Sequence, residues 1–206
     1  CLSGAGHLTS FVGTDTCPAV GWIRDHFDDP KDYLIGTSVP ATEHSVMCTG
    51  GEDNELETID RLLDLYPAGV LSVVSDTWDF WQVVTEILPK LKPKIMARNG
   101  TYVTRPDSSP KTPVEIICGD PDADPTSPEG KGLIQLLWEI FGGTVNEAGY
   151  KMLDSHVGAI YGDSITPERA EEILFRLEKM GFCSNSIVFG VGSYTYQYVT
   201  RDTHGF

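Results

Sequence analysis

The sequence predicts an α/β fold in which parallel strands curve toward a (β/α) barrel. Short β-type runs alternate with amphipathic helical stretches along the chain, at a period of about 30 residues. Parallel neighbours need a crossover, and a helix supplies it. All six expected strands end in residues that can do chemistry. A barrel gathers every such end around one pocket, whereas an open doubly wound sheet uses mainly its switch point. Six units are fewer than eight, so we expect the barrel to be incomplete.

The first half of the chain holds three of these strand–helix units. Strands are expected in three apolar runs, at 8–12, 33–39 and 70–74. The intervening helices are expected at 18–26, along a stripe of Leu56, Ile59, Leu62 and Leu63, and at 78–91. Pro18 suits the first turn of the first helix, because its missing N–H is unpaired there anyway.

The second half holds three more strands, expected at 101–104, 157–161 and 186–189. Asn99-Gly100 favours a small hairpin that would pair 95–97 with the first of them. A weak helix at 112–118, an exposed acidic loop at 119–130 and a firmer helix at 133–141 fill the next stretch. The clearest helix begins with Thr166 as N-cap and Pro167 at its first position, and stops at Gly181.

Composition excludes several classes of protein. Fifteen basic against 30 acidic residues give a net charge of −15, which repels nucleic acid and anionic membrane surfaces. No run is long and apolar enough to span a membrane, and the first residues lack the pattern of a signal peptide, so we expect a cytoplasmic protein. The five cysteines form no CxxC pair, so we expect them to be reduced. The chain starts at Cys1 without a methionine, and we expect a fragment of a longer protein.

Two candidate side chains follow the first two strands. Asp15, in GTDT, can accept hydrogen bonds from a substrate amide or hydroxyl, although it can equally cap the next helix. His44, in SVPATEHS, can act as a general base, a nucleophile or a phosphoryl acceptor, whereas a lone histidine is more often structural.

Four further candidates follow the third and fourth strands. Asp76 and Asp79, in SDTWDF, lie near one face at the start of a helix, where complementing the helix dipole is the simpler explanation for each. Arg105 and Asp107, in RPDS, lie on the same side of an extended segment. The guanidinium suits a phosphate or an aromatic ring and the carboxylate suits ribose hydroxyls, with a plain salt bridge as the equal alternative.

Glycines mark the last two strand ends. Gly162-Asp163 and the segment Gly190-Val191-Gly192-Ser193 expose backbone amides that suit a phosphate, although glycines also make ordinary turns. Arg201 can add positive charge to the same phosphate. Together the six strand ends describe a sugar-phosphate site in a barrel.

These motifs carry a resemblance to a known family. GTDT, SVPATEHS, SVVSDTWD, RPDS, YGDS and FGVGSYTYQYVTRDTHGF resemble, in order and over essentially the whole chain, the nicotinamide phosphoribosyltransferases, particularly their bacterial and phage forms. The resemblance implies a type II phosphoribosyltransferase barrel, of which residues 1–206 would be the central part, without the N-terminal region and C-terminal end. It also implies transfer of the phosphoribosyl group from phosphoribosyl pyrophosphate to nicotinamide, giving nicotinamide mononucleotide and pyrophosphate in NAD biosynthesis.

The resemblance assigns roles to single residues. His44 would be phosphorylated by ATP, with Asp79 beside it, and Asp15 would accept the carboxamide NH2, with Ser38 lining the same pocket. Arg105 would lie beside the nicotinamide and the ribose. The remaining assignments concern the sugar phosphate: Asp107, Gly162 and Asp163 at the ribose, and Gly192, Ser193 and Arg201 at the 5-phosphate.

Cofactors and partners follow from the same resemblance. Magnesium would be held mainly by the pyrophosphate, ATP would be a co-substrate, and the parent protein would be a homodimer whose second subunit completes the pocket; the fragment alone would be inactive. Nicotinate phosphoribosyltransferase is the alternative within the class, disfavoured by the carboxylate at Asp15. A barrel aldolase or isomerase would need a strand-end lysine or paired base, and a non-catalytic binding protein ranks third.

Overall fold

The computed structural model describes residues 2–27, 33–107 and 111–192. These residues form two compact units, one that runs up to Val39 and one that runs from Pro40 to Gly192. Within the described residues, Cys17, Cys48, Cys118 and Cys183 are free thiols.

The first unit contains two helices, α1 (Leu2–Leu8) and α2 (Cys17–His26). The helix expected at 18–26 is confirmed, and Pro18 lies in its first turn. The strand expected at 8–12 is wrong, because Leu8 ends α1 and buries its side chain against Ala19 and Ile35. The strand expected at 33–39 is reduced to one parallel bridge, between Gly13 and Thr37.

The second unit is built on a four-stranded sheet whose strands are all parallel. In spatial order these are β1 (Leu71–Val74), β2 (Tyr102–Arg105), β5 (Val157–Tyr161) and β6 (Val188–Phe189). The order follows the chain without a reversal, and an isolated parallel bridge from Ala41 to Ser72 extends it at the β1 edge. The predicted α/β class with a parallel sheet is therefore confirmed.

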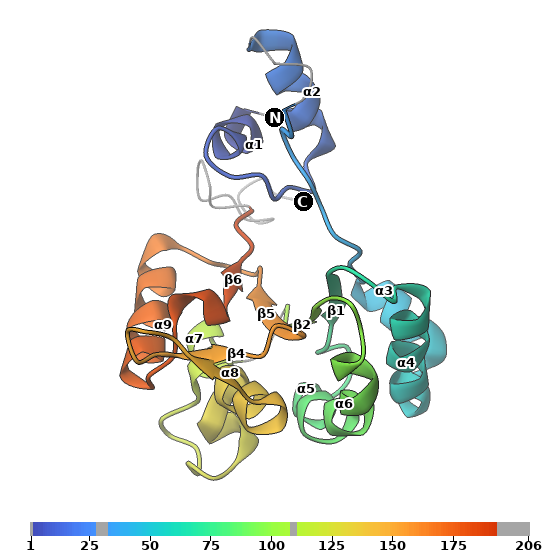
Figure 1. The fold of residues 1–206 in the computed structure, drawn as a ribbon, viewed down its shortest axis with the longest axis vertical. Coiled ribbons are helices and arrows are strands. Elements are labelled where there is room, and N and C mark those ends of the chain that lie inside the picture. Colours follow the sequence, from blue (N-terminus) through green and yellow to red (C-terminus); the bar gives the residue numbers. More distant parts are fainter. Residues whose placement is uncertain (1, 28–32, 108–110, 193–206) are drawn as a thin grey trace, which may run out of the picture. The chain divides into compact units, whose positions relative to one another are not determined.

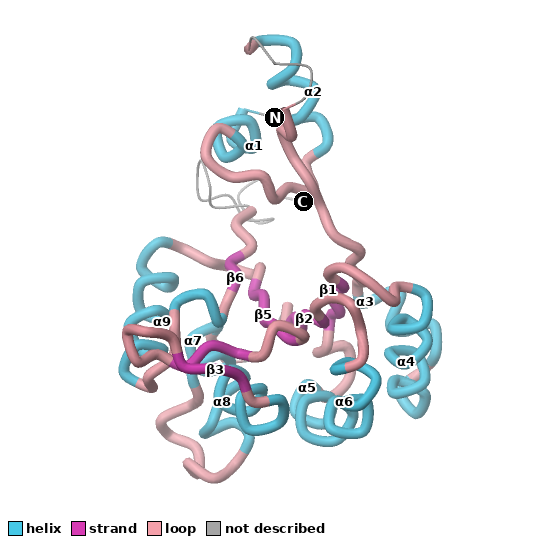
Figure 2. The backbone as a smooth tube through the Cα atoms, viewed as in Figure 1, coloured by secondary structure: helices cyan, strands magenta, loops and turns pink. Residues whose placement is uncertain are grey.

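Helices cover one side of this sheet, as Figures 1 and 2 show. They are α3 (His44–Met47), α4 (Glu55–Leu65), α5 (Phe80–Gln82), α6 (Leu88–Met96), α7 (Pro113–Cys118), α8 (Pro128–Phe141) and α9 (Pro167–Lys179). A crossover in one hand between neighbouring strands places successive helices on the same face when the strand order never reverses. The loops at the carboxyl ends of the strands therefore share one edge.

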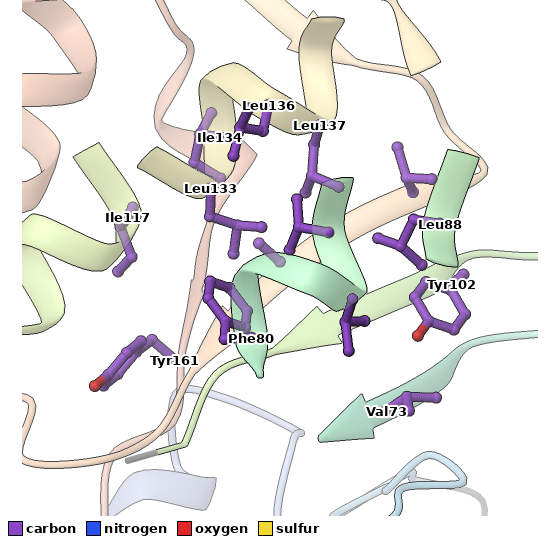
Figure 3. Close-up of a cluster of buried hydrophobic side chains, with 14 of the residues drawn as sticks. Val73, Phe80, Leu88, Tyr102, Ile117, Leu133, Ile134, Leu136, Leu137 and Tyr161 are labelled. Atoms are coloured by element: carbon purple, nitrogen blue, oxygen red, sulfur yellow. The ribbon is translucent and has the colours of Figure 1, made fainter. Parts of the chain in front are cut away.

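The core lies between the sheet and these helices (Figure 3). Val73 of β1 and Tyr102 of β2 lie near Leu88 of α6, and all three side chains are fully buried. Leu133 and Leu137 of α8 pack into the same cluster. All four residues of β1 are buried, so polar side chains of this segment can reach solvent only in the loop that follows the strand.

Three local expectations differ from the structure. The helix expected at 78–91 runs on to Met96, because a π-helical turn at Val83–Ile87 joins α5 to α6 just before Pro89 removes a backbone donor. The hairpin expected from 95–97 is wrong, since these residues end α6 and Asn99 bridges instead to Ala68. A short antiparallel pair, β3 (Gly143–Val145) and β4 (Lys151–Leu153), was not predicted, because three-residue strands carry almost no pattern.

The other helices agree with their sequence signals. Thr112 and Glu115 form a capping box at α7. Thr166 caps α9 by accepting a hydrogen bond from the Arg169 N–H, and Gly181 adopts a positive φ of 78° just after the helix. The last strand, expected at 186–189, is confirmed only over β6, because Ser184–Ser186 form a 3-10 turn.

Candidate active site

The carboxyl ends of β1 and β2 are tied together by the parallel register. Val74 pairs with Arg105, and the Ser75 N–H donates to the Arg105 carbonyl at 2.9 Å. One step further along, the Asp107 N–H donates to Asp76 Oδ2 at 2.9 Å. Two carboxylates that are 31 residues apart in sequence therefore lie side by side at one edge of the sheet.

His44 lies over this pair of carboxylates. Its Nε2 is 3.6 Å from Asp107 Oδ2 and 3.9 Å from Asp76 Oδ1, and its Nδ1 is 3.2 Å from Thr77 Oγ1. The His44 side chain is 39% exposed and that of Asp76 only 5%, so a ligand can reach the ring, and the Asp76 carboxylate is buried close to it. Neighbouring carboxylates can orient an imidazole, which suits a histidine that carries a proton or a phosphoryl group.

The guanidinium of Arg105 is held by a hydrogen bond to a backbone carbonyl. Its Nη2 donates to the Thr42 carbonyl at 2.6 Å, and Thr42 is itself held because its Oγ1 accepts from the Val74 N–H at 2.9 Å. Within the described residues the buried Nε of Arg105 has no hydrogen-bond partner. A half-buried guanidinium held at one nitrogen can bind an anion through its remaining donors or lie against a ring.

The ends of β5 and β6 approach each other closely at two glycines. A Cβ on Gly190 would lie 3.0 Å from the Gly162 Cα, and one on Gly162 would lie 4.0 Å from Asp107 Oδ1. These glycines therefore let two backbones meet beside a carboxylate. Burial, with the charges of Asp163, Asp76 and Asp107, raises the pKa of Tyr161 to about 12. Asp163 thus contributes to the same acidic edge as the two carboxylates below His44.

Not every expected residue lies at this cluster. Asp79 is the N-cap of α5, where its Oδ1 accepts from the Gln82 N–H at 3.0 Å, and the carboxylates within 4 Å of His44 are Asp76 and Asp107. Gly192 follows β6 and is exposed. Ser193 and Arg201 lie outside the described residues.

Asp15 and Ser38 belong to the first unit and lie together there. The parallel bridge between Gly13 and Thr37 aligns the two segments, and the Ser38 hydroxyl donates to Asp15 Oδ1. Both side chains are exposed. The carboxylate keeps acceptor capacity for a further donor, such as a carboxamide NH2.

Sequence reasoning missed three residues that shape this edge. Thr42 and Thr77 hold Arg105 and His44, and neither has a pattern that marks it. Glu55 is the first residue of α4 and is only 2% exposed. A signal for Glu55 exists, because it falls on the same apolar stripe as Ile59 and Leu63, one turn earlier.

Two searches of the described residues bear on metals and membranes. They contain no group of three or more His, Cys, Asp or Glu side chains placed to hold a metal ion. None of the helices described is long and apolar enough to cross a membrane.

Comparison with known proteins agrees with the motifs. The family model of the nicotinate phosphoribosyltransferase family matches residues 2–206. A nicotinamide phosphoribosyltransferase of Acinetobacter baylyi is 56% identical over 211 residues, and one of Mycoplasma pneumoniae is 43% identical over 200 residues. A third, from Xanthomonas campestris, is 35% identical over 208 residues.

These matches cover nearly the whole of this chain but only part of each relative. They span 99%, 97% and 100% of the chain against 41%, 41% and 40% of the relatives. The chain therefore corresponds to about two fifths of the length of the relatives it matches. The match to the family model over almost every residue shows that the chain belongs to the nicotinate phosphoribosyltransferase family.

Proposed function

We propose that this chain is the central part of a nicotinamide phosphoribosyltransferase, which transfers the phosphoribosyl group of phosphoribosyl pyrophosphate to nicotinamide and releases pyrophosphate. The observation that carries the proposal is the cluster of His44, Asp76, Arg105 and Asp107 at one sheet edge, in a chain 56% identical to a relative of that name. A histidine, an arginine and carboxylates at adjacent strand ends supply the groups that a sugar phosphate and its leaving group need.

The sheet supports an incomplete barrel. Its strands are parallel and follow the chain order, with helices along one side, which is the arrangement in a sector of a (β/α) barrel. In the proposal, residues 1–206 form the central part of this barrel domain, and other parts of a longer protein complete it. A homodimer then completes the pocket, and the fragment alone is inactive.

In the proposed mechanism the residues mainly position and stabilise charge. Departure of pyrophosphate leaves a ribosyl centre with positive character, and the carboxylates Asp107 and Asp163 bind the ribose and offset this charge. Gly162 and Gly192 give backbone amides to the sugar phosphate, with Ser193 and Arg201 as further ligands. Arg105 orients the ring of nicotinamide so that its nitrogen faces the anomeric carbon.

His44 couples ATP to the reaction in this proposal. Its Nε2 or Nδ1 attacks the γ-phosphorus of ATP, the bond to the ADP oxygen breaks, and the ring proton passes to a neighbouring carboxylate or to water. Asp76 and Asp107 orient the ring for that attack, and Asp79 fixes the start of α5 beside them. The phosphohistidine is then hydrolysed, and this returns the ring for another cycle.

Magnesium is a proposed cofactor that arrives with the pyrophosphate. The described residues contain no group of three or more side chains placed to hold a metal ion, so the pyrophosphate oxygens would provide most of the hard oxygen ligands that magnesium prefers. When bound, the ion would neutralise the leaving charge, and no protein ligand is assigned to it. Because its substrates are metabolites of the cell interior, the proposal places the protein in the cytoplasm.

Asp15 and Ser38 would select the amide substrate. The Asp15 carboxylate can accept a hydrogen bond from a carboxamide NH2 and repels the carboxylate of nicotinic acid. Nicotinate phosphoribosyltransferase, the alternative activity, is named by the family model but by none of the relatives described above.

The experiment is product formation by the full-length protein from phosphoribosyl pyrophosphate, with nicotinamide or nicotinic acid, each with and without ATP. The proposal predicts a preference for nicotinamide and stimulation by ATP. A preference for nicotinic acid would contradict the role of Asp15, and the absence of product from either base would contradict the activity itself.

A further inference from the structure

Glu55 is an acidic residue in the position of a core residue. It opens α4 on the stripe that continues with Ile59 and Leu63, and its side chain is 2% exposed. Within the described residues its Oε1 is buried and has no hydrogen-bond partner. Burying an ionised carboxylate without such partners is costly, so the neutral acid is the form that this environment favours.

The charged groups that act on Glu55 come from three directions. Glu52 lies in the turn before α4, Asp76 follows β1 and Asp79 caps α5, and all three are carboxylates. Burial, followed by the charges of Asp79, Glu52 and Asp76, raises the pKa of Glu55 to about 7. All three of these neighbours are acidic, so each of their charges disfavours the ionised form of Glu55.

Tyr102 is a second buried polar residue in this region. The Tyr102 side chain of β2 is fully buried, its hydroxyl has no hydrogen-bond partner within the described residues, and its pKa is raised by burial and by the charge of Glu55. Arg98, which acts electrostatically on Tyr102, donates from Nε and Nη2 to the Tyr66 carbonyl and from Nη2 to the Gly69 carbonyl, while its buried Nη1 has no hydrogen-bond partner within the described residues. Glu55 and Tyr102 are therefore buried polar residues that act on each other electrostatically, and Asp76 acts on Glu55.

Asp76 links Glu55 to the candidate active site. Asp76 acts electrostatically on Glu55, and its Oδ1 is 3.9 Å from His44 Nε2. A second negative charge behind Asp76 would repel any phosphoryl or pyrophosphate group that approaches His44. A neutral Glu55 removes that repulsion while it still fills the space.

We propose that Glu55 is a positioning residue, held as a neutral carboxylic acid in the buried region next to Asp76, so that the site at His44 can accept anionic groups. The role rests on the proposed function, because it concerns the phosphoryl and pyrophosphate groups of that reaction. Ionisation of Glu55 adds a buried negative charge and weakens the site for those groups.

The test uses the full-length protein with two variants, Glu55→Gln and the matched control Glu57→Gln. Glutamine imitates the neutral acid, while Glu57 is an exposed carboxylate two residues further along the same helix. The first measurement is the urea midpoint between pH 4 and 9, which needs no activity. The second is the pH profile of kcat/KM for phosphoribosyl pyrophosphate with nicotinamide.

The expected stability result follows from the sign of the shift. A carboxyl whose pKa rises from 4.5 to about 7 on folding binds more protons in the folded state, so the protein loses stability as the pH rises from about 4.5 to 7. The wild type and Glu57→Gln should therefore lose urea midpoint over this window relative to Glu55→Gln. Equal pH dependence in wild type and Glu55→Gln would overturn the proposal, and so would a Glu55→Gln protein that fails to fold while Glu57→Gln folds.

The expected kinetic result separates this proposal from the function itself. The wild type and Glu57→Gln should show a decline of kcat/KM above pH 7 that Glu55→Gln lacks, with a difference of roughly tenfold at pH 8. The same alkaline decline in Glu55→Gln would overturn the role of Glu55 and leave the function standing. If the protein makes no product at all, the function fails, and the stability profiles alone decide whether Glu55 is held neutral.

Discussion

The two units of the chain differ in how deeply their elements are buried. In the first unit the buried apolar cluster is Leu8, Ala19 and Ile35, and the unit leaves several large apolar side chains exposed, namely Leu2, Phe11, Phe27, Tyr33 and Leu34. In the second unit a continuous core underlies the whole sheet. The groups that need fixed geometry, His44 and Arg105, stand on the second unit, whereas Asp15 and Ser38, proposed to read the base, stand on the first.

The difference teaches where sequence patterns are reliable. A strand that is buried against helices must carry apolar residues, so its sequence shows a clear hydrophobic pattern. The expected strands at 70–74, 101–104 and 157–161 accordingly agree with β1, β2 and β5. In the first unit few of the described residues are buried, so burial does not impose a strand on the apolar run at 8–12. The first residue of that run, Leu8, belongs to α1 instead.

The largest expected effect compares one substitution in the two cores. Ile134→Ala removes a fully buried side chain from the middle of α8 and should cost about 3–5 kcal/mol of folding free energy, because close neighbours on all sides cannot collapse into the cavity. Ile35→Ala, in the small cluster, should cost about 2 kcal/mol or less. Urea denaturation of the full-length variants measures both, and equal costs would remove the contrast between the units.

The next effect compares a glycine in each unit. Gly190→Ala would bring a Cβ to 3.0 Å from the Gly162 Cα, so the ends of β5 and β6 must move apart, at a cost of about 1–3 kcal/mol. Gly21→Ala, inside α2 with nothing within 4 Å of its Cβ, should stabilise by about 0.5–1 kcal/mol.

Both substitutions add one methyl group. Opposite changes in folding free energy would therefore come from the different surroundings of the two glycines. Gly190→Ala should also raise the KM for phosphoribosyl pyrophosphate, and Gly21→Ala should leave it unchanged. Thermal denaturation and initial-rate kinetics measure both, and a neutral Gly190→Ala would show that the close approach at the strand ends is dispensable.

The smallest effect tests the role of the first unit. Asp15→Asn keeps an acceptor for the carboxamide, removes the charge that repels nicotinic acid and retains a partner for Ser38. The ratio of kcat/KM for nicotinamide over nicotinic acid should fall by about tenfold, which corresponds to roughly 1.4 kcal/mol. An unchanged ratio would mean that the discrimination lies elsewhere.

The candidate site was predictable only in part, and the limits have physical causes. Strand ends identified Arg105, Asp107, Gly162 and Asp163, because parallel strands carry their functional residues at one edge. Which carboxylate meets His44 depends on the register of β1 against β2 and on the helix start, so motif spacing did not distinguish Asp76 from Asp79.

Residues that act through burial were the hardest to foresee. Glu55 reads as an acidic residue in the first turn of a helix, which is common on a solvated surface. Its place on the apolar stripe of α4 indicates burial, but only the structure shows that its side chain is 2% exposed and that its electrostatic neighbours are carboxylates. Thr42 could not be identified from the sequence either, because it contacts Arg105 through its backbone carbonyl.

The measurement that tests the central claim most directly is kcat/KM for nicotinamide mononucleotide formation by the full-length Asp107→Asn protein. Asp107 joins the ends of β1 and β2 and lies 3.6 Å from His44, so loss of its charge should lower kcat/KM by about 100-fold. Asp122→Asn, in the exposed loop before α8, serves as the control and should match the wild type. A folded Asp107→Asn protein with wild-type kcat/KM would contradict the assignment of this sheet edge as the active site.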